Sequence, residues 1–149
     1  VWWKIRPHLD LKTIEFRVCD AQRDLGNVKI LGSLTRALVY TAYFECINGT
    51  LKENLSVEYL NDSLWKASRF DFKCKVYDEV SNKILSMAEL VRLMYNYCHD
   101  ALVLFNDANI INRIEDILMN GTEYDEQLKI HKKEGMDGLK LYLMDNVGY

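Results

Sequence analysis

Residues 13–19 read Thr13-Ile14-Glu15-Phe16-Arg17-Val18-Cys19, with an apolar side chain at every second position from Ile14 to Val18. Side chains alternate between the two faces of a β-strand, so this stretch predicts a strand with one apolar face, which we expect to be buried. The opposite face would then hold Glu15 and Arg17, with about 7 Å between their Cα atoms. A carboxylate and a guanidinium would lie side by side on a rigid platform that faces a cleft.

Strand and helix patterns extend outward from this segment along the chain. A second strand is expected over residues 2–6, and a long helix over residues 25–47. Asp20 or Asp24 could cap the start of that helix, and Gly49 suits its end. The remaining sequence predicts a helix over 52–60, then a turn of helix or an irregular crossing over 63–72, and a hairpin over 73–77 and 83–85. Further helices are expected over 86–98, 110–120, 122–134 and 136–146.

These patterns predict an α+β fold that is mostly helical, with a few antiparallel strands near the N-terminus. The chain has 149 residues, 49% of them apolar, which suits a single domain with a real core. Residues 1–20 would form a strand pair, and residues 21–149 would support it as a bundle of helices on the long helix. Because the sequence begins at Val1, inside an apolar run, we expect it to be part of a longer protein.

The composition argues against several classes of protein, namely nucleic-acid-binding, membrane-spanning and disulfide-rich proteins. A net charge of −3 offers no basic excess for nucleic-acid binding, and no apolar run reaches the roughly 18–20 residues of a membrane span. The four cysteines are far apart, which disfavours a zinc site or disulfide framework and fits a reduced, cytoplasmic protein. Residues 1–75 hold 12 Lys and Arg against 9 Asp and Glu, whereas residues 76–149 hold 7 against 13. An anion site is therefore expected in the first half, unless the two halves simply carry solvated faces of unlike sign.

The chemistry of the predicted strand face suits a metal and a phosphate. Magnesium takes one or two carboxylates together with phosphate oxygens, and arginine bonds phosphate with a planar fork of N–H donors. Glu15 would hold the metal, and Arg17 the phosphate that the metal also touches. Arg6 in the neighbouring strand, and Arg69 between Trp65 and Phe70, could converge on the same anion. The alternative is a solvated sheet face with a cross-strand Glu–Arg pair.

Three segments, in this order, carry a resemblance to a known family: Trp2-Trp3-Lys4-Ile5-Arg6-Pro7, Thr13-Ile14-Glu15-Phe16-Arg17-Val18-Cys19-Asp20 and Trp65-Lys66-Ala67-Ser68-Arg69-Phe70. They resemble the C-terminal portion of the carboxylate-amine ligases, also called glutamate–cysteine ligase type 2 proteins, which belong to the glutamine synthetase-like superfamily. The stretch 112–118, with Gly121 and Tyr124 after it, is similar to the family's closing helices. The resemblance implies that the N-terminal strands form part of a glutamine synthetase-like catalytic sheet.

The resemblance also implies an activity. These enzymes use ATP and Mg²⁺ to join a carboxylate, typically the γ-carboxylate of glutamate, to an amine such as that of cysteine, through an acyl phosphate. By this resemblance Glu15 is a metal ligand, Arg6 and Arg17 are catalytic, and Arg6, Arg17 and Arg69 bind the substrate carboxylate or ATP. The partners would be these small molecules and the remainder of the same polypeptide, and the long helix could serve a homo-oligomer. Residues 1–149 alone are expected to be inactive, since the family's other metal ligands precede Val1.

The sequence departs from the family pattern at three positions. Lys12 and Asp71 stand where the family usually has glycine, and Lys4 where it often has aspartate. Glycine permits backbone conformations that other residues resist, so both turn geometry and nucleotide binding come into question. Two alternatives stay open: a non-catalytic helical interaction module that retains the family frame, and an enzyme that hydrolyses a γ-glutamyl amide.

Overall fold

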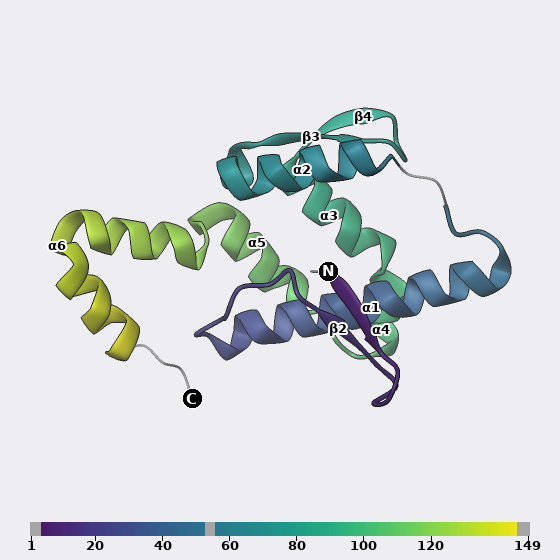
Figure 1. Cartoon of the computed structure of the whole chain (residues 1–149), viewed down its shortest axis with the longest axis horizontal. Coiled ribbons are helices and arrows are strands. Elements are labelled where there is room, and N and C mark those ends of the chain that lie inside the picture. The colour runs from purple at the N-terminus through teal and green to yellow at the C-terminus, as the bar shows by residue number, and fades with distance from the viewer. Residues whose placement is uncertain (1–3, 53–55, 146–149) are drawn as a thin grey trace.

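The computed structural model describes residues 4–52 and 56–145 and confirms a mostly helical α+β fold (Figure 1). Residues 2 and 3 of the first predicted strand lie outside the described part of the chain. Among the described residues, no helix is both long enough and apolar enough to cross a membrane. The elements in chain order are β1 (Ile5–His8), β2 (Thr13–Phe16), α1 (Leu25–Asn48), α2 (Val57–Phe70), the 3₁₀ turn η1 (Asp71–Lys73), β3 (Lys75–Asp78), β4 (Lys83–Ser86), α3 (Met87–Tyr97), α4 (His99–Leu104), α5 (Ile110–Asn120) and α6 (Glu123–Asp145).

β1 and β2 form an antiparallel hairpin in which Arg6 lies directly opposite Glu15. Both strands differ from their predicted ranges, since β1 begins at residue 5 and β2 ends at Phe16 rather than at residue 19. The expected burial of the apolar face of β2 is wrong, because Ile14 is 50% exposed and Val18 56% exposed. The hairpin stands over α1 with open space beneath it, as described below, and so its apolar side chains do not join the core.

α1 is the helix on which the rest of the molecule is assembled, and its predicted range is confirmed within one residue. Asp24, not Asp20, caps its start by accepting a hydrogen bond from the backbone N–H of Asn27, and Gly49 ends it with φ 68° and ψ 24°. One stripe of α1 packs against α3, α4 and α5. The buried core consists of Ile30, Leu34, Ala37, Tyr95, Cys98, Ala101, Leu102, Ile110 and Ile114.

The structure divides residues 52–72 differently from the prediction, and residues 53–55 of the first predicted helix lie outside the described part of the chain. A single helix, α2, is capped by Ser56 and continues to Phe70, so residues 63–70 are helical and do not form an irregular crossing. Asn61-Asp62-Ser63 resembles a helix break in the sequence, but Asp62 pairs with Lys66 one turn later at 2.6 Å and so supports the helix. The predicted hairpin is confirmed as β3–β4, which packs on α2, and α4 is a short helix that we did not predict separately.

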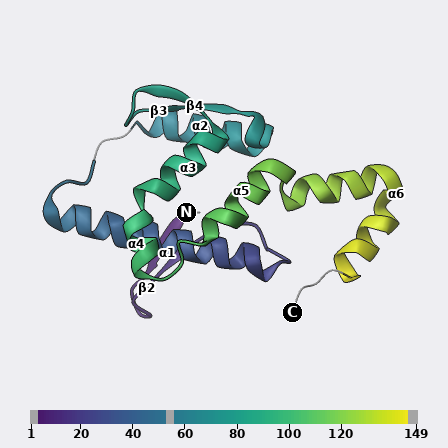
Figure 2. The ribbon, with the colours of Figure 1, turned by 180° about the vertical axis from the view of Figure 1, so that it is seen from behind.

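Two helices were expected after Thr122, and the structure shows α6 as two arms joined at a kink. Gly135 has φ 71° and ψ −164° there, a conformation that is essentially restricted to glycine. Figures 1 and 2 show the second arm bending back toward the start of α1. The break therefore lies where the two predicted helices were separated.

Lys12 and Asp71 both adopt left-handed backbone conformations without being glycine. Their φ angles are 51° and 53°, and ψ of Asp71 is −143°. These are the two positions where the family resemblance leads one to expect glycine, so the turns keep a glycine-like geometry although the glycines are absent. Such a conformation costs a residue with a Cβ atom on the order of 1–3 kcal/mol.

We predict that Asp71→Gly stabilises the protein, because it removes this backbone strain. The free energy of unfolding, measured by urea denaturation, should rise by about 1 kcal/mol after the extra chain entropy of glycine is deducted. Asp71→Ala is the matched control, since it removes the carboxylate and keeps the Cβ atom. An equal gain in both variants would show that the carboxylate, and not the backbone, is the source of the effect.

Candidate functional site

Three of the four predicted site residues meet on the β1–β2 hairpin. We call Arg6, Glu15 and Arg17 the Glu15 cluster. Arg6 Nη2 lies 2.6 Å from Glu15 Oε2, and Arg17 Nε lies 3.6 Å from Glu15 Oε1. The antiparallel register puts Arg6 opposite Glu15, while the two-residue spacing puts Arg17 beside it. A cross-strand Glu–Arg pair, the alternative that the sequence left open, is therefore present, and the assignment of Glu15 to a metal and of Arg17 to a phosphate stays a prediction.

The Glu15 cluster carries two positive charges against one negative charge and is partly open to solvent. The side chains of Arg6, Glu15 and Arg17 are 49%, 42% and 29% exposed. Glu15 Oε2 itself is covered and accepts no hydrogen bond, because the N–H groups of Arg6 are not directed at it despite the short N···O distance. The contact is thus a close ion pair without good hydrogen-bond geometry. Half-exposed pairs of this kind are held by little energy and exchange partners readily.

Arg69 lies apart from the Glu15 cluster. It is near the C-terminal end of α2, close to a Trp65–Phe70 edge-to-face pair whose ring centroids are 5.7 Å apart. Within the described part of the chain, Arg69 forms no hydrogen bond or ion pair. Its guanidinium lies on the wall of a cavity of about 1020 Å³, which we call the larger cavity. The structure therefore does not join Arg69 to the two other arginines, and its role stays a prediction.

The larger cavity is bounded by the loop before α1, the end of α2, and α5 with α6. Its charged lining has more acidic than basic residues: Asp20, Asp71, Asp116, Glu123 and Glu126 against Arg69 and Arg113. Arg113 is already engaged, since its Nη1 lies 2.7 Å from Asp116 Oδ2. Acidic and basic groups thus face one cavity together, an arrangement that suits a polar, charged ligand.

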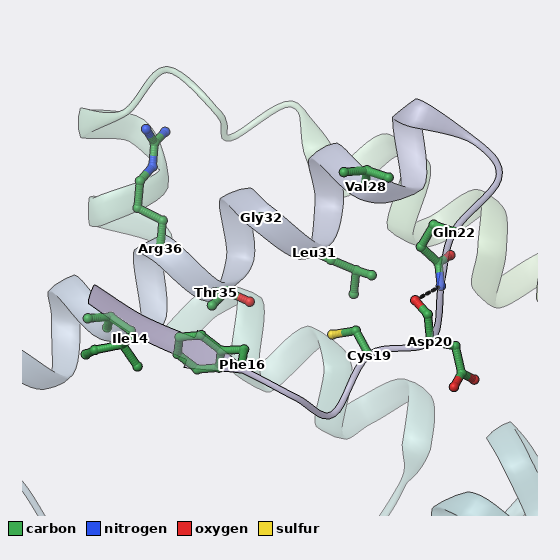
Figure 3. Close-up of a pocket in the computed structure, with 11 residues that line it drawn as sticks. Ile14, Phe16, Cys19, Asp20, Gln22, Val28, Leu31, Gly32, Thr35 and Arg36 are labelled. Carbon is green, nitrogen blue, oxygen red and sulfur yellow. Dashed lines mark hydrogen bonds between the residues drawn. The ribbon is translucent and has the colours of Figure 1, made fainter. Parts of the chain in front are cut away.

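A smaller cavity of about 630 Å³ lies beneath the hairpin, between β2 and α1 (Figure 3). Ile14 and Phe16 face α1 across it, on the side of β2 opposite Glu15, and Cys19, in the loop that follows β2, lines the same side of the cavity. Its lining is mainly apolar. Asp20 and Gln22 line both cavities, so the loop that follows β2 forms a wall common to the two.

Sequence reasoning missed Arg36, which lines the smaller cavity. Its Nη2 lies 2.6 Å from Asp107 Oδ2, and its guanidinium stacks 4.2 Å above the Phe105 ring centroid. A hydrogen bond from Ser33, followed by the charge of Arg36, lowers the pKa of Asp107 and keeps it ionised. Ser33 and Arg36 stand one helical turn apart on α1, and this spacing is the signal that could have indicated a shared partner.

The described residues offer a magnesium ion one carboxylate at the Glu15 cluster. No three His, Cys, Asp or Glu side chains gather anywhere in residues 4–52 and 56–145 in a way that could hold a metal. Magnesium in phosphate chemistry often takes one or two protein carboxylates, with phosphate oxygens and water completing the shell. Glu15 between two guanidinium groups fits one corner of such a site, and the ATP and Mg²⁺ predictions stay predictions.

Comparison with known proteins gives relatives along nearly the whole chain. A protein of Chloroflexus aurantiacus named "Putative glutamate--cysteine ligase 2" is 26% identical over 152 residues, which cover 99% of this chain and 39% of that protein. Proteins of the same name from Sorangium cellulosum and Gloeobacter violaceus are 23% and 27% identical, each over 89% of this chain and 36% of its own length. No solved structure matches the chain.

The chain thus spans less than two-fifths of the length of these relatives. The family model for glutamate-cysteine ligase family 2 matches residues 1–140, a range that includes the Glu15 cluster, Arg69 and both cavities except for Tyr142 in the second arm of α6. The resemblance carried by the three sequence segments is confirmed: this chain belongs to glutamate–cysteine ligase family 2.

Proposed function

We propose that this chain supplies one wall of the active site of an ATP- and Mg²⁺-dependent carboxylate-amine ligase that forms a γ-glutamyl amide bond. The observation that carries the proposal is the Glu15 cluster, a carboxylate between two guanidinium groups on the open face of a hairpin. Membership of the family supports the type of reaction. Because the relatives are more than twice as long as this chain, the activity is proposed for a ligase of their full length.

The reaction needs two anions to meet. A substrate carboxylate attacks the γ-phosphorus of ATP, and ADP leaves. The amine then attacks the carbonyl carbon of the acyl phosphate, so that the C–N bond forms, phosphate leaves and the amine loses a proton. Arg6 and Arg17 can offset the repulsion between the carboxylate and the phosphate, and also the charge on the transferring phosphoryl oxygens. Bound Mg²⁺ would add neutralising charge at the same oxygens.

An exchange of partners would let the cluster perform both of its roles. In the described state, each Glu15 oxygen has one guanidinium beside it. An incoming phosphate offers bidentate acceptors that compete for these guanidinium groups, and charge-assisted bonds to phosphate are strong. Once Arg6 turns to phosphate, Glu15 Oε2 becomes available to a cation. The partial exposure of the three side chains keeps the energy needed for this exchange small.

Arg69 is proposed to bind the second anionic group, which is either the carboxylate of the amino-acid substrate or a nucleotide phosphate. It lies on the larger cavity with no partner among the described residues, and this leaves its five donors for a ligand.

The thiols of the chain are free, including exposed Cys19 and Cys46, which favours a reducing, cytoplasmic setting.

The proposed function predicts the effect of two substitutions in the Glu15 cluster on activity. In the full-length ligase, supplied with glutamate, Mg·ATP and a panel of amines, Glu15→Gln and Arg17→Gln should each lower kcat for amine-dependent phosphate release by about 10²–10³-fold, as loss of a group that stabilises transition-state charge does. Glu134→Gln is the matched control. Glu134 pairs with Lys133 at 3.0 Å on α6, far along the chain from the hairpin, and its variant should keep full activity.

Other outcomes favour the alternatives. An absence of turnover with every amine, together with an absence of ATP binding by calorimetry, would favour a non-catalytic interaction module. ATP-independent release of amine from a γ-glutamyl amide would favour a hydrolase. Full activity in Glu15→Gln would remove the cluster from the active site.

A stability measurement distinguishes a functional role of the Glu15 cluster from a structural one. Half-exposed ion pairs contribute little to folding, so Glu15→Gln should change the free energy of unfolding of this chain by less than about 1 kcal/mol. Leu102→Ala, which empties a position with 0% exposure, should cost about 2–5 kcal/mol in the same urea titration. A loss in Glu15→Gln as large as that in Leu102→Ala would mean that the cluster is structural.

A further inference from the structure

The two arms of α6 are bridged by one arginine from outside the helix. Arg23, in the loop before α1, places Nε 2.7 Å from Glu123 Oε1 in the first arm. Its Nη1 donates to the carbonyl oxygen of Tyr142 in the second arm at 3.2 Å, and its guanidinium lies 4.1 Å from the centroid of the Tyr142 ring. A single side chain therefore holds the start of the first arm and the end of the second.

Tyr142 strengthens the same bridge. Its hydroxyl donates to Glu123 Oε2 at 3.4 Å. Burial first, and then the charge of Glu123, raise the pKa of Tyr142, so the hydroxyl keeps its proton. Arg23 and Glu123 are 17% and 26% exposed, far less than the other ion pairs of α6, so their interaction is less screened by water.

The position of this bridge relates it to the larger cavity. Tyr142 and Glu123 both line that cavity, and so does Arg69. Between them, the chain turns at Gly135, where an added Cβ atom would meet no atom within 4 Å. No neighbouring side chain therefore packs closely against the kink, and the contacts that hold the far end of the second arm include those of Tyr142 with Arg23 and Glu123.

We propose that the second arm of α6, residues 136–145, is a hinged flap over the larger cavity, turning at Gly135 and latched by Arg23 across Glu123 and Tyr142. Opening breaks the contacts of Tyr142 with Arg23 and with Glu123, while the Arg23–Glu123 ion pair stays in place. Arg23 thus stays bound to the first arm and can bind Tyr142 again when the flap closes. This inference concerns access to the cavity and does not depend on the ligase activity.

Hydrogen–deuterium exchange of the whole chain tests the flap. In Arg23→Ala, the amides of residues 138–145 should exchange roughly tenfold faster than in the unchanged protein, because a detached helical arm of this length is marginal and frays. The amides of residues 126–134 should change by less than about twofold. Arg92→Ala is the matched control: it removes the Arg92–Glu115 ion pair from the body of the protein and should leave the flap protected.

Variants at the other end of the latch keep the proposal testable if Arg23→Ala does not fold. Tyr142→Ala removes the ring and the hydroxyl but keeps the backbone carbonyl acceptor, so it should accelerate exchange in residues 138–145 by less than Arg23→Ala does. The double variant should exchange no faster than Arg23→Ala alone, because the contacts between the two residues are then already lost. Tyr142→Phe keeps the ring and the carbonyl acceptor and should stay mostly latched. Equal acceleration of both arms, acceleration by Arg92→Ala, or unchanged exchange in Arg23→Ala and Tyr142→Ala would each overturn the flap.

Discussion

The burial of one stripe of α1 against α4 and α5 is the packing on which the rest of the molecule depends. Ala37 is 0% exposed and faces a core in which Leu102 is also 0% exposed, so no larger side chain fits there without displacing a neighbour. This packing determines which face of α1 points away from the core. The hairpin and the smaller cavity lie on that outward face (Figure 3), so the packing of the core determines the position of the candidate site.

The hairpin positions the Glu15 cluster although few of its own side chains are buried. Its pairing register, and not tight packing, sets Arg6 against Glu15, while Ile14 beneath them remains half exposed. The Glu15 cluster is thus placed accurately in the plane of the two strands but is only loosely tied to the body of the protein. The proposed exchange of an internal ion pair for a phosphate would benefit from such weak ties, since each displaced contact costs little. The same weakness leaves apolar side chains of β2 open to further packing.

Local signals in the sequence predicted the elements whose ends are determined by neighbouring residues. The range of α1 follows from Asp24, one of the two expected caps, and from Gly49. The start of α3, expected at residue 86, coincides with a capping box formed by Ser86 and Glu89. The pairing of Glu15 with Arg17 also follows from strand alternation. Long-range geometry carried no such signal: the separation of Arg69 from the Glu15 cluster depends on where α2 packs, and the bridge from Arg23 to Tyr142 spans 119 positions of the chain.

The loop that follows β2 contacts both cavities, both arms of α6 and the start of α1, and local sequence patterns do not predict these long-range contacts. Within a few residues, Asp20 and Gln22 line both cavities, Arg23 holds the two arms of α6, and Asp24 caps α1. The cap fixes the end of the loop on the rigid helix, and β2 fixes its beginning on the loosely packed hairpin. A shift of the hairpin therefore moves one end of this loop while the other end stays in place, and the walls of both cavities move with it.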